Sequence, residues 1–309
     1  MKIIYNCYGG SHSSVTSAAI HLGLVGDRVP CARDLCRLPN YDAQVRKDHG
    51  TLRLMGTDEF QNQVYVVGRR SMGKPVSRAM AGLAEIFGIP KQDFMLVDPM
   101  PFVNLAMMIG GYTSRRLGLI PLGRPIVCWG TRLAFPRLRK LVAGVKKKLQ
   151  QQQPLGAATP GNTAVQVKNK RIVVYCDYTG RQQAAAAASM HLGRDIIGRI
   201  GRNPKAGNLN FCGTDVHDVE VYTLGVIYEN ELIPKVMREF AKLYGIPADN
   251  LTIVDLIPLG KTVFAIGALF ERVALLRHVG EKWTKLMVRN KIGGLKSAVA
   301  LINRKMSSW

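Results

Sequence analysis

The chain has 309 residues, 47% of them hydrophobic, and 43 Lys and Arg against 21 Asp and Glu give a formal net charge of +22. This composition suits one large or two ordinary globular domains and excludes disordered, collagen-like and coiled-coil chains. The charge favours an anionic partner, which can be nucleic acid, an acidic membrane surface or a phosphorylated small molecule.

The predicted elements alternate along the first half of the chain. Short β-rich runs predict strands at residues 3–7, 52–55, 64–67, 94–97 and 126–129. Apolar residues at helical spacing predict helices at 15–22, 76–87 and 103–117, the first two ended by Gly23 and Gly88. This order indicates an α/β domain of three layers, with a mostly parallel sheet flanked by helices. Ligands of such sheets bind at the carboxyl ends of the strands.

The whole pattern occurs twice. An offset of 170 residues pairs the first strand and helix with a later segment, and an offset of 157 pairs the remaining segments. Matched segments include His21-Leu22-Gly23 with His191-Leu192-Gly193, Gly56-Thr57-Asp58 with Gly213-Thr214-Asp215, and Gly88-Ile89-Pro90 with Gly245-Ile246-Pro247. We predict a first copy at 1–149, a Gln-rich linker at 150–170 and a second copy at 171–309, with the two copies packed on each other.

The turn after the first strand is the candidate binding site. Its glycines let the backbone approach an anion closely, and the first-turn N–H groups of the helix would donate to it. The predicted ligand-binding residues of this turn are Gly9, Gly10, Ser11, His12, Ser13 and Ser14. The alternative is that these serines only cap the helix. The turn matches neither a Walker A loop nor a dinucleotide-binding loop, because the required Lys and glycine spacing are absent.

Residues beyond the turn extend the candidate site. Arg69 and Arg70 follow a strand and are expected at the same sheet edge, where Arg suits phosphate recognition. Asp98 follows another strand, as a ligand-binding or structural residue. The catalytic candidates are His12, Cys7 and His49, although a cysteine phosphatase needs Arg where Ser13 stands, which favours a buried, inert thiol.

Three further groups have other interpretations. His21 and His191, at helix ends in both copies, are interpreted as structural. Arg115 and Arg116 are interpreted as a surface pair at the end of a helix. A turn after the strand predicted at 126–129 is a weaker candidate anion site, formed by Gly130, Thr131 and Arg132.

The residues around the turn also resemble a known family. The run from Ile3 to Gly23, the segment Val97-Asp98-Pro99-Met100-Pro101 and the segment Ser114-Arg115-Arg116-Leu117-Gly118 carry the likeness. They resemble an uncharacterised Firmicutes family, domain-of-unknown-function family 3189, whose members have about the size of one copy here. The resemblance implies a bacterial cytosolic setting and no particular activity.

The second copy departs from the first mainly at the candidate site. Cys7 is replaced by Asp177, Ser13 and Ser14 by Gln183 and Ala184, and Arg69 by Val226. The scaffold residues persist, and Asp255 stands opposite Asp98. The residues that the second copy has lost are therefore the predicted site, on the premise that the first copy is the functional one.

The sequence thus predicts a protein that binds a phosphorylated small molecule or nucleotide at the glycine turn. The alternative is a basic RNA-binding or assembly protein without catalytic activity, although no RNA-binding motif is present. No cofactor is predicted other than such a nucleotide, and no metal, because the six cysteines lack C-x-x-C spacing and a His pair. No signal peptide or transmembrane segment is predicted, so a cytoplasmic location is expected.

Overall fold

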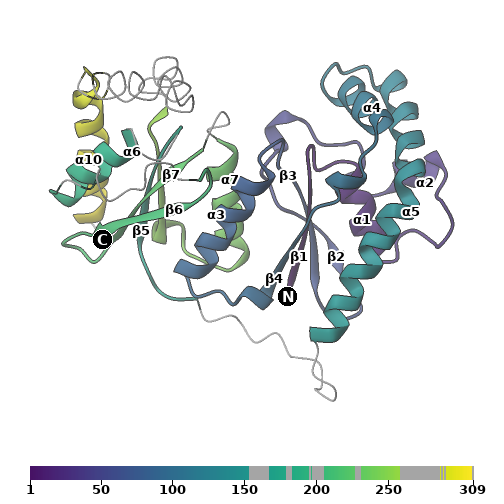
Figure 1. Ribbon diagram of the computed structural model, residues 1–309, viewed down its shortest axis with the longest axis horizontal. Coiled ribbons are helices and arrows are strands. Elements are labelled where there is room, and N and C mark those ends of the chain that lie inside the picture. Colours follow the sequence, from purple (N-terminus) through teal and green to yellow (C-terminus); the bar gives the residue numbers. More distant parts are fainter. Residues whose placement is uncertain are drawn as a thin grey trace, which may run out of the picture. The chain divides into compact units, whose positions relative to one another are not determined.

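The computed structural model describes residues 1–152, 167–178, 183–194, 196, 205–226, 231–257, 286, 288 and 290–307 (Figure 1). The chain divides into two compact units. The first unit consists of Met1–Gly73 and Pro90–Val165, and the second unit consists of Lys74–Ile89 and Gln166–Trp309.

The first unit is built around a four-stranded sheet. Its elements are β1 (Lys2–Cys7), α1 (Ser13–His21), α2 (Ala32–Arg37), β2 (Arg53–Thr57), β3 (Gln63–Gly68), β4 (Phe94–Val97), α4 (Leu105–Arg115) and α5 (Ile120–Gln152). The strand order is β2-β3-β1-β4. β1 runs parallel to β3 and β4, and only β2 is antiparallel, so the predicted α/β class and mostly parallel sheet are confirmed.

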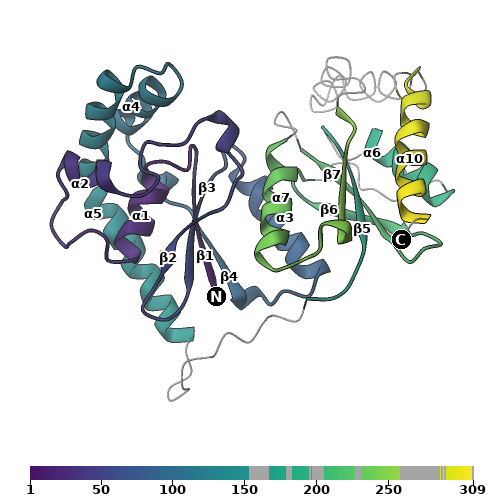
Figure 2. The ribbon, with the colours of Figure 1, turned by 180° about the vertical axis from the view of Figure 1, so that it is seen from behind.

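Period-two alternation along β1 explains the packing on one face of this sheet. Ile3 and Tyr5 are fully buried and join one apolar cluster with Val15 and Ala18 of α1 and Val142 of α5. The ribbon shows α1 and α5 together beside the strands (Figure 2). This packing fixes the start of α1 over the carboxyl end of β1.

The second unit repeats the same topology. Its elements are β5 (Ile172–Asp177), α6 (Gln183–Leu192), β6 (Leu209–Thr214), β7 (Glu220–Gly225), α7 (Leu232–Leu243), β8 (Leu251–Asp255) and α10 (Ile292–Ser307). The strand order β6-β7-β5-β8 reproduces the first sheet, with β6 antiparallel. Both sheets even have a register shift at the equivalent glycines, Gly56 and Gly213. The sequence repeat is therefore a repeat of the fold.

One helix of the first copy belongs to the second unit. This is α3 (Gly73–Ile86), nearly all of which falls within Lys74–Ile89. Arg78 Nη1 donates to the Ala206 carbonyl at 3.0 Å, and the Lys168 N–H donates to the Phe87 carbonyl at 2.9 Å. The compact units thus differ from the two sequence copies by this one helix, and α7, its counterpart, stays in the second unit.

The strand predicted at 126–129 is wrong, because these residues lie inside α5. The glycines that suggested turns serve close helix packing instead: a Cβ at Gly130 would lie 2.6 Å from the Met107 backbone N, and one at Gly110 would overlap Val127 N. Gly130, Thr131 and Arg132 are likewise helical, so the predicted anion-binding turn there is also wrong. Most of the predicted linker, residues 153–166, lies outside the described residues. Within the described ranges, every helix is too short or too polar to cross a lipid bilayer.

Candidate functional site

The glycine loop, residues 8–12, joins the end of β1 to the start of α1. Gly10 has φ +71°, and a Cβ there would lie 2.5 Å from the Gly68 backbone N at the end of β3. A Cβ at Gly68 would in turn lie 2.6 Å from the Gly9 carbonyl oxygen. The loop therefore lies directly over the end of the neighbouring parallel strand, which only glycine permits at these positions.

The Cys7 side chain is buried beneath this loop. The Gly10 N–H donates to Cys7 Sγ at 3.1 Å, and Ser14 Oγ lies 3.1 Å from the same sulfur. A backbone donor and a hydroxyl thus converge on one sulfur atom at the start of a helix.

The serines do not cap α1. His12 occupies the N-cap position and no side chain caps the helix there. The first helical bond runs from the Thr16 N–H to the His12 carbonyl at 2.8 Å, so the N–H groups of residues 13–15 precede it. Ser11 instead accepts a bond from the Gln44 N–H at 3.2 Å. The capping interpretation is therefore wrong, because no side chain accepts from the first turn of α1.

The second copy fills the equivalent position with its own anion. Asp177, opposite Cys7, is buried, and its Oδ2 accepts a hydrogen bond from the Ala184 N–H at 3.0 Å. Ala184 is the counterpart of Ser14 at the start of α6. The residues between them, 179–182, lie outside the described residues. A carboxylate thus accepts from the helix start in one copy, where the other copy has a thiol.

Arg69 and Asp98 tie three strand ends together. The Arg69 guanidinium is buried, and its Nε donates to Asn6 Oδ1 at 2.6 Å while Nη2 donates to Asp98 Oδ2 at 2.7 Å. Asp98 Oδ1 also accepts from the Met100 N–H at 2.9 Å. Arg69 and Asp98, two of the predicted ligand-binding residues, lie at the expected sheet edge. The partners of the hydrogen bonds given above are other groups of the protein.

Arg70 and His49 come together beside the glycine loop. Arg70 Nε donates to His49 Nδ1 at 2.8 Å. The His49 ring meets Tyr8 edge-on, with 6.4 Å between ring centroids, and its Cδ2 lies 3.0 Å from where a Cβ of Gly68 would be. The Gly50 N–H donates to the Gly68 carbonyl, which anchors this turn at the end of β3. Two predicted site residues from distant parts of the sequence thus border the same loop.

His12 points to a carboxylate that the sequence reasoning missed. Its Nε2 lies 3.1 Å from Asp42 Oδ1, and its ring meets Tyr41 edge-on. Asp42 is buried, with φ +47°, and its N–H donates to the Ser11 carbonyl at 3.1 Å. The segment after α2 is therefore bonded to the glycine loop through both backbone and side chain.

Two arginines and a serine complete the Asp42 cluster. Ser114 Oγ donates to both carboxylate oxygens at 2.8 and 2.9 Å, and the Nε atoms of Arg115 and Arg124 each lie 3.0 Å from one of them. Burial alone would raise the pKa of Asp42, but hydrogen bonds from His12, Arg124 and Ser114 outweigh it and lower the pKa to about 2. Arg115 is thus an ion-pair partner, which corrects its interpretation as half of a surface pair, whereas Arg116 is exposed.

We expect Asp42→Asn to destabilise the first unit by about 3 kcal/mol, because the surrounding cations lose a buried partner. The carboxylate contributes about 2 kcal/mol from its pKa shift. Because the folded-state pKa is the lower one, this contribution is complete above pH 3.8 and is lost as the pH falls to about 2. The loss of stability is measured by hydrogen exchange of the backbone amides of α1 and α4. The control is Asp27→Asn, because the Asp27 side chain is fully exposed. Equal protection of these amides from exchange in both variants would contradict the stabilising role of Asp42.

A buried Tyr-His-Asp triad recurs in both copies. Tyr5 Oη lies 2.8 Å from His21 Nδ1, and His21 Nε2 lies 3.0 Å from Asp58 Oδ2. Burial lowers the pKa of His21 despite the Asp58 carboxylate. Tyr175, His191 and Asp215 repeat the arrangement at 2.8 and 3.1 Å. Since both copies have the triad, it links helix, strand and turn in each of them as part of the scaffold.

One signal could have found the missed residues. The second copy is shorter between its first helix and its second strand, where the offset falls from 170 to 157. The first copy has α2, Asp42 and Gln44 in this interval, and the Gln44 side-chain amide donates to the Gly10 carbonyl. Residues that the second copy lacks altogether, and not only those that it replaces, therefore indicate this segment.

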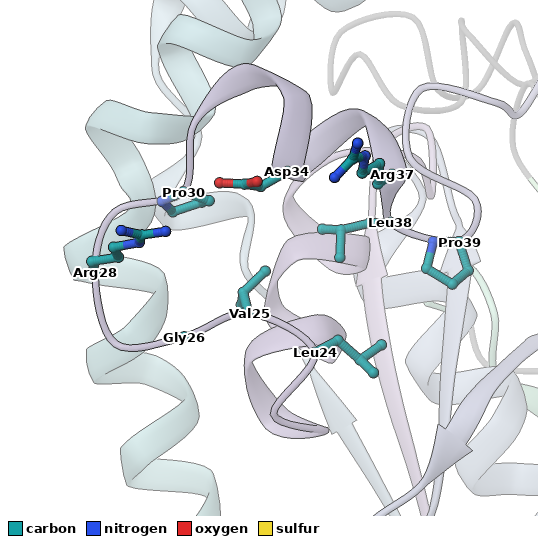
Figure 3. Close-up of a pocket in the computed structure, with 9 residues that line it drawn as sticks. All are labelled: Leu24, Val25, Gly26, Arg28, Pro30, Asp34, Arg37, Leu38 and Pro39. Carbon is teal, nitrogen blue, oxygen red and sulfur yellow. The ribbon is translucent and has the colours of Figure 1, made fainter.

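A separate hollow lies at the opposite end of α1. It has a volume of about 500 Å³ and lies between the chain following α1 and helix α2 (Figure 3). Its lining residues are Leu24, Val25, Gly26, Arg28, Pro30, Asp34, Arg37, Leu38 and Pro39. None of the predicted site residues lines it. Across the described residues, no group of three or more His, Cys, Asp or Glu is arranged to hold a metal ion.

Two successive copies of one sheet domain, of which only the first has consecutive glycines after its first strand, define a tandem α/β-domain protein. The chain belongs to the family described as "Protein of unknown function (DUF3189)", whose model matches residues 2–147 and again 172–304. The two matches confirm the predicted family and its tandem arrangement. No curated protein and no solved structure matches the chain.

Proposed function

We propose that the first copy binds the phosphate group of a small phosphorylated molecule or nucleotide at the glycine loop. The observation that carries this proposal is the internal comparison with the second copy. There, the Asp177 carboxylate accepts the N–H of Ala184 and so supplies an anion from within. The first copy has the same helix start, no capping side chain and no carboxylate at this position, which leaves the anion to be supplied by a ligand.

Cationic and polar groups around the loop support the same proposal. Arg70 and His49 border Gly9 and Gly68, and both side chains can donate to phosphate oxygens. Arg124 pairs with Asp42 while its side chain stays 43% exposed. A phosphate on the N–H groups at the start of α1 would therefore meet basic side chains beside the loop. The buried Cys7 sulfur would lie beneath it.

The donors at the start of α1 suit a terminal phosphate group, which sugar phosphates, nucleotides and other phosphate monoesters all present. Nucleic acid presents phosphodiesters along a chain instead, and the alternative of RNA binding would use the basic surface as a whole. Salt separates the two, because binding along a nucleic acid backbone weakens steeply as salt rises and a compact phosphate site is less sensitive.

The test is thermal unfolding of the full chain against nucleotides, sugar phosphates and a short RNA at low and high salt. A ligand present at about a hundred times its dissociation constant adds roughly 2.7 kcal/mol to the stability of the folded state. We expect one small phosphate ligand to stabilise the wild type at both salt concentrations, and Arg70→Gln to lose most of that stabilisation.

The matched control is Arg238→Gln, which removes the same charge from an exposed position on α7. It should leave the stabilisation unchanged. No response to any small phosphate, together with a salt-sensitive response to RNA, would replace the proposed function with the RNA-binding alternative.

A further inference from the structure

Exposed apolar side chains concentrate in one part of the first unit. Half of the large apolar side chains that are exposed in the described residues come from residues 105–133, which contain α4 and the first half of α5. They are Leu105, Met108, Ile109, Tyr112, Leu117, Leu119, Leu122, Ile126, Trp129 and Leu133. Scattered exposed apolar residues are normal, but a concentration of this kind marks an interaction surface.

The spacing of these residues gives each helix an apolar stripe. On α4 they recur at positions 105, 108, 109 and 112, and on α5 at 122, 126, 129 and 133. Both series follow the helical period, so each lies along one side of its helix. We call the two stripes together the apolar face of the α4–α5 hairpin.

Among the described residues, these side chains stay exposed and are not packed into the fold. α4 packs on α5 through Gly110, Gly123 and Gly130, where any Cβ would meet the backbone of the other helix. Met107 and Ser114, on the same side of α4 as Gly110, are buried. The hairpin is thus closed by its glycine side, and the apolar face is left outside.

Every charged residue within the α4–α5 hairpin is basic, and acidic side chains from other segments pair with Arg115, Arg124, Arg139 and Lys146. No Asp or Glu occurs between Asp98 and Asp177. The basic residues of α4, α5 and their connection are Arg115, Arg116, Arg124, Arg132, Arg137, Arg139, Lys140, Lys146, Lys147 and Lys148. Arg137 and Lys140 are exposed and lie four and seven residues beyond Leu133, so they continue the stripe of α5 as a basic surface.

We propose that the α4–α5 hairpin lies on the surface of a membrane that contains anionic phospholipids. Apolar side chains on one side of a helix, with basic residues beside them, are typical of helices that lie in the membrane interface. Tyr112 and Trp129, 56% and 57% exposed, are residue types that favour this interface. The two stripes would enter the headgroup region, and the basic side chains beside them would contact the lipid phosphates.

Charge complementarity selects this occupant. Two copies of the chain that joined through the apolar face would bring two acid-free, strongly basic hairpins together, and like charges oppose that contact. Nucleic acid would satisfy the charge but would leave the Leu, Ile and Met side chains in water. A lipid surface with anionic headgroups satisfies both the apolar and the basic side chains.

The test is co-sedimentation of the full chain with vesicles of phosphatidylcholine alone and with vesicles that also contain phosphatidylglycerol. We expect binding to the mixed vesicles only, and weaker binding as salt rises. The triple variant Leu105→Gln, Leu122→Gln, Leu133→Gln should bind about a hundredfold more weakly, since all three side chains are exposed apolar anchors. Circular dichroism checks that the variant is folded.

The matched control is Val216→Gln, which changes an apolar side chain that is 94% exposed in the second unit. It should bind the mixed vesicles like the wild type. A second readout is Trp129 fluorescence in a chain carrying Trp283→Phe and Trp309→Phe, which should shift to shorter wavelength on the mixed vesicles.

Three results would overturn the proposal. The first is no binding to either kind of vesicle. The second is binding that the triple variant retains, which would show that charge elsewhere on the protein is responsible. The third is a dimer in light scattering that the triple variant abolishes while vesicles fail to bind, which would assign the apolar face to a second copy of the chain.

Discussion

Cys7→Asp should abolish phosphate binding while the first unit stays folded. The substitution gives the first copy the residue that the second copy has at this position, where Asp177 is buried and accepts the Ala184 N–H. In the variant, the new carboxylate would accept from the start of α1 in the same way. It would compete with a phosphate for the same donors and repel it by charge, so we expect at least about a hundredfold loss of affinity.

The measurement is calorimetric titration with the small phosphate ligand that most stabilises the wild type. Cys7→Ser is the matched control, because it keeps a small neutral side chain and adds no charge. It should retain binding. If Cys7→Asp bound the ligand as tightly as the wild type, the anion would not be held by the start of α1. The proposed function would then fail at this loop.

Gly207→Ala should destabilise the second unit by about 3 kcal/mol or more. Gly207 has φ +84°, and a Cβ there would overlap the carbonyl oxygen of Pro75 in α3. The backbone conformation costs a side chain about 1 kcal/mol, and the displacement of α3 adds the rest. The expected loss of stability therefore depends on α3 being packed in this unit.

Gly193→Ala isolates the contribution of the helix contact. Gly193 also has a positive φ, +61°, but no atom lies within 4 Å of its added Cβ. This variant should lose only about 1 kcal/mol. Hydrogen exchange of β6 and β7 reports on the second unit for both variants. Equal losses would mean that α3 does not pack against Gly207 in solution.

Much of the fold can be predicted because the repeat presents several elements twice. Strands and helices that recur at a fixed offset, such as β1 with β5, are recognisable in both copies. The strand predicted at 126–129 is wrong for a physical reason. Its apolar run resembles a strand between Pro125 and Gly130, but Gly130 is required for the approach of α4, and packing overrides the local preference.

The site is predictable in outline and less so in its side chains. The parallel sheet places the residues after β1, β3 and β4 at one edge, as expected from the strand order. Sequence position does not predict the direction of each side chain. Arg69 and Arg70 are adjacent in the chain, but Arg69 donates to Asp98 and Arg70 donates to His49. Asp42 belongs to no recognisable sequence motif, and only its contacts with His12 and Ser114 place it beside the glycine loop.

The assignment of α3 to the second unit also bears on whether either copy could be lost from the chain. The chain passes between the units three times, at residues 73–74, 89–90 and 165–166. A deletion of the first copy would therefore remove a helix from the second unit, and a deletion of the second would remove the contacts of that helix with Lys168, Ala206 and Gly207. Neither copy could then be deleted without destabilising the unit that remains. We therefore expect both copies to be retained for folding, whatever residues change in the loop of the second copy.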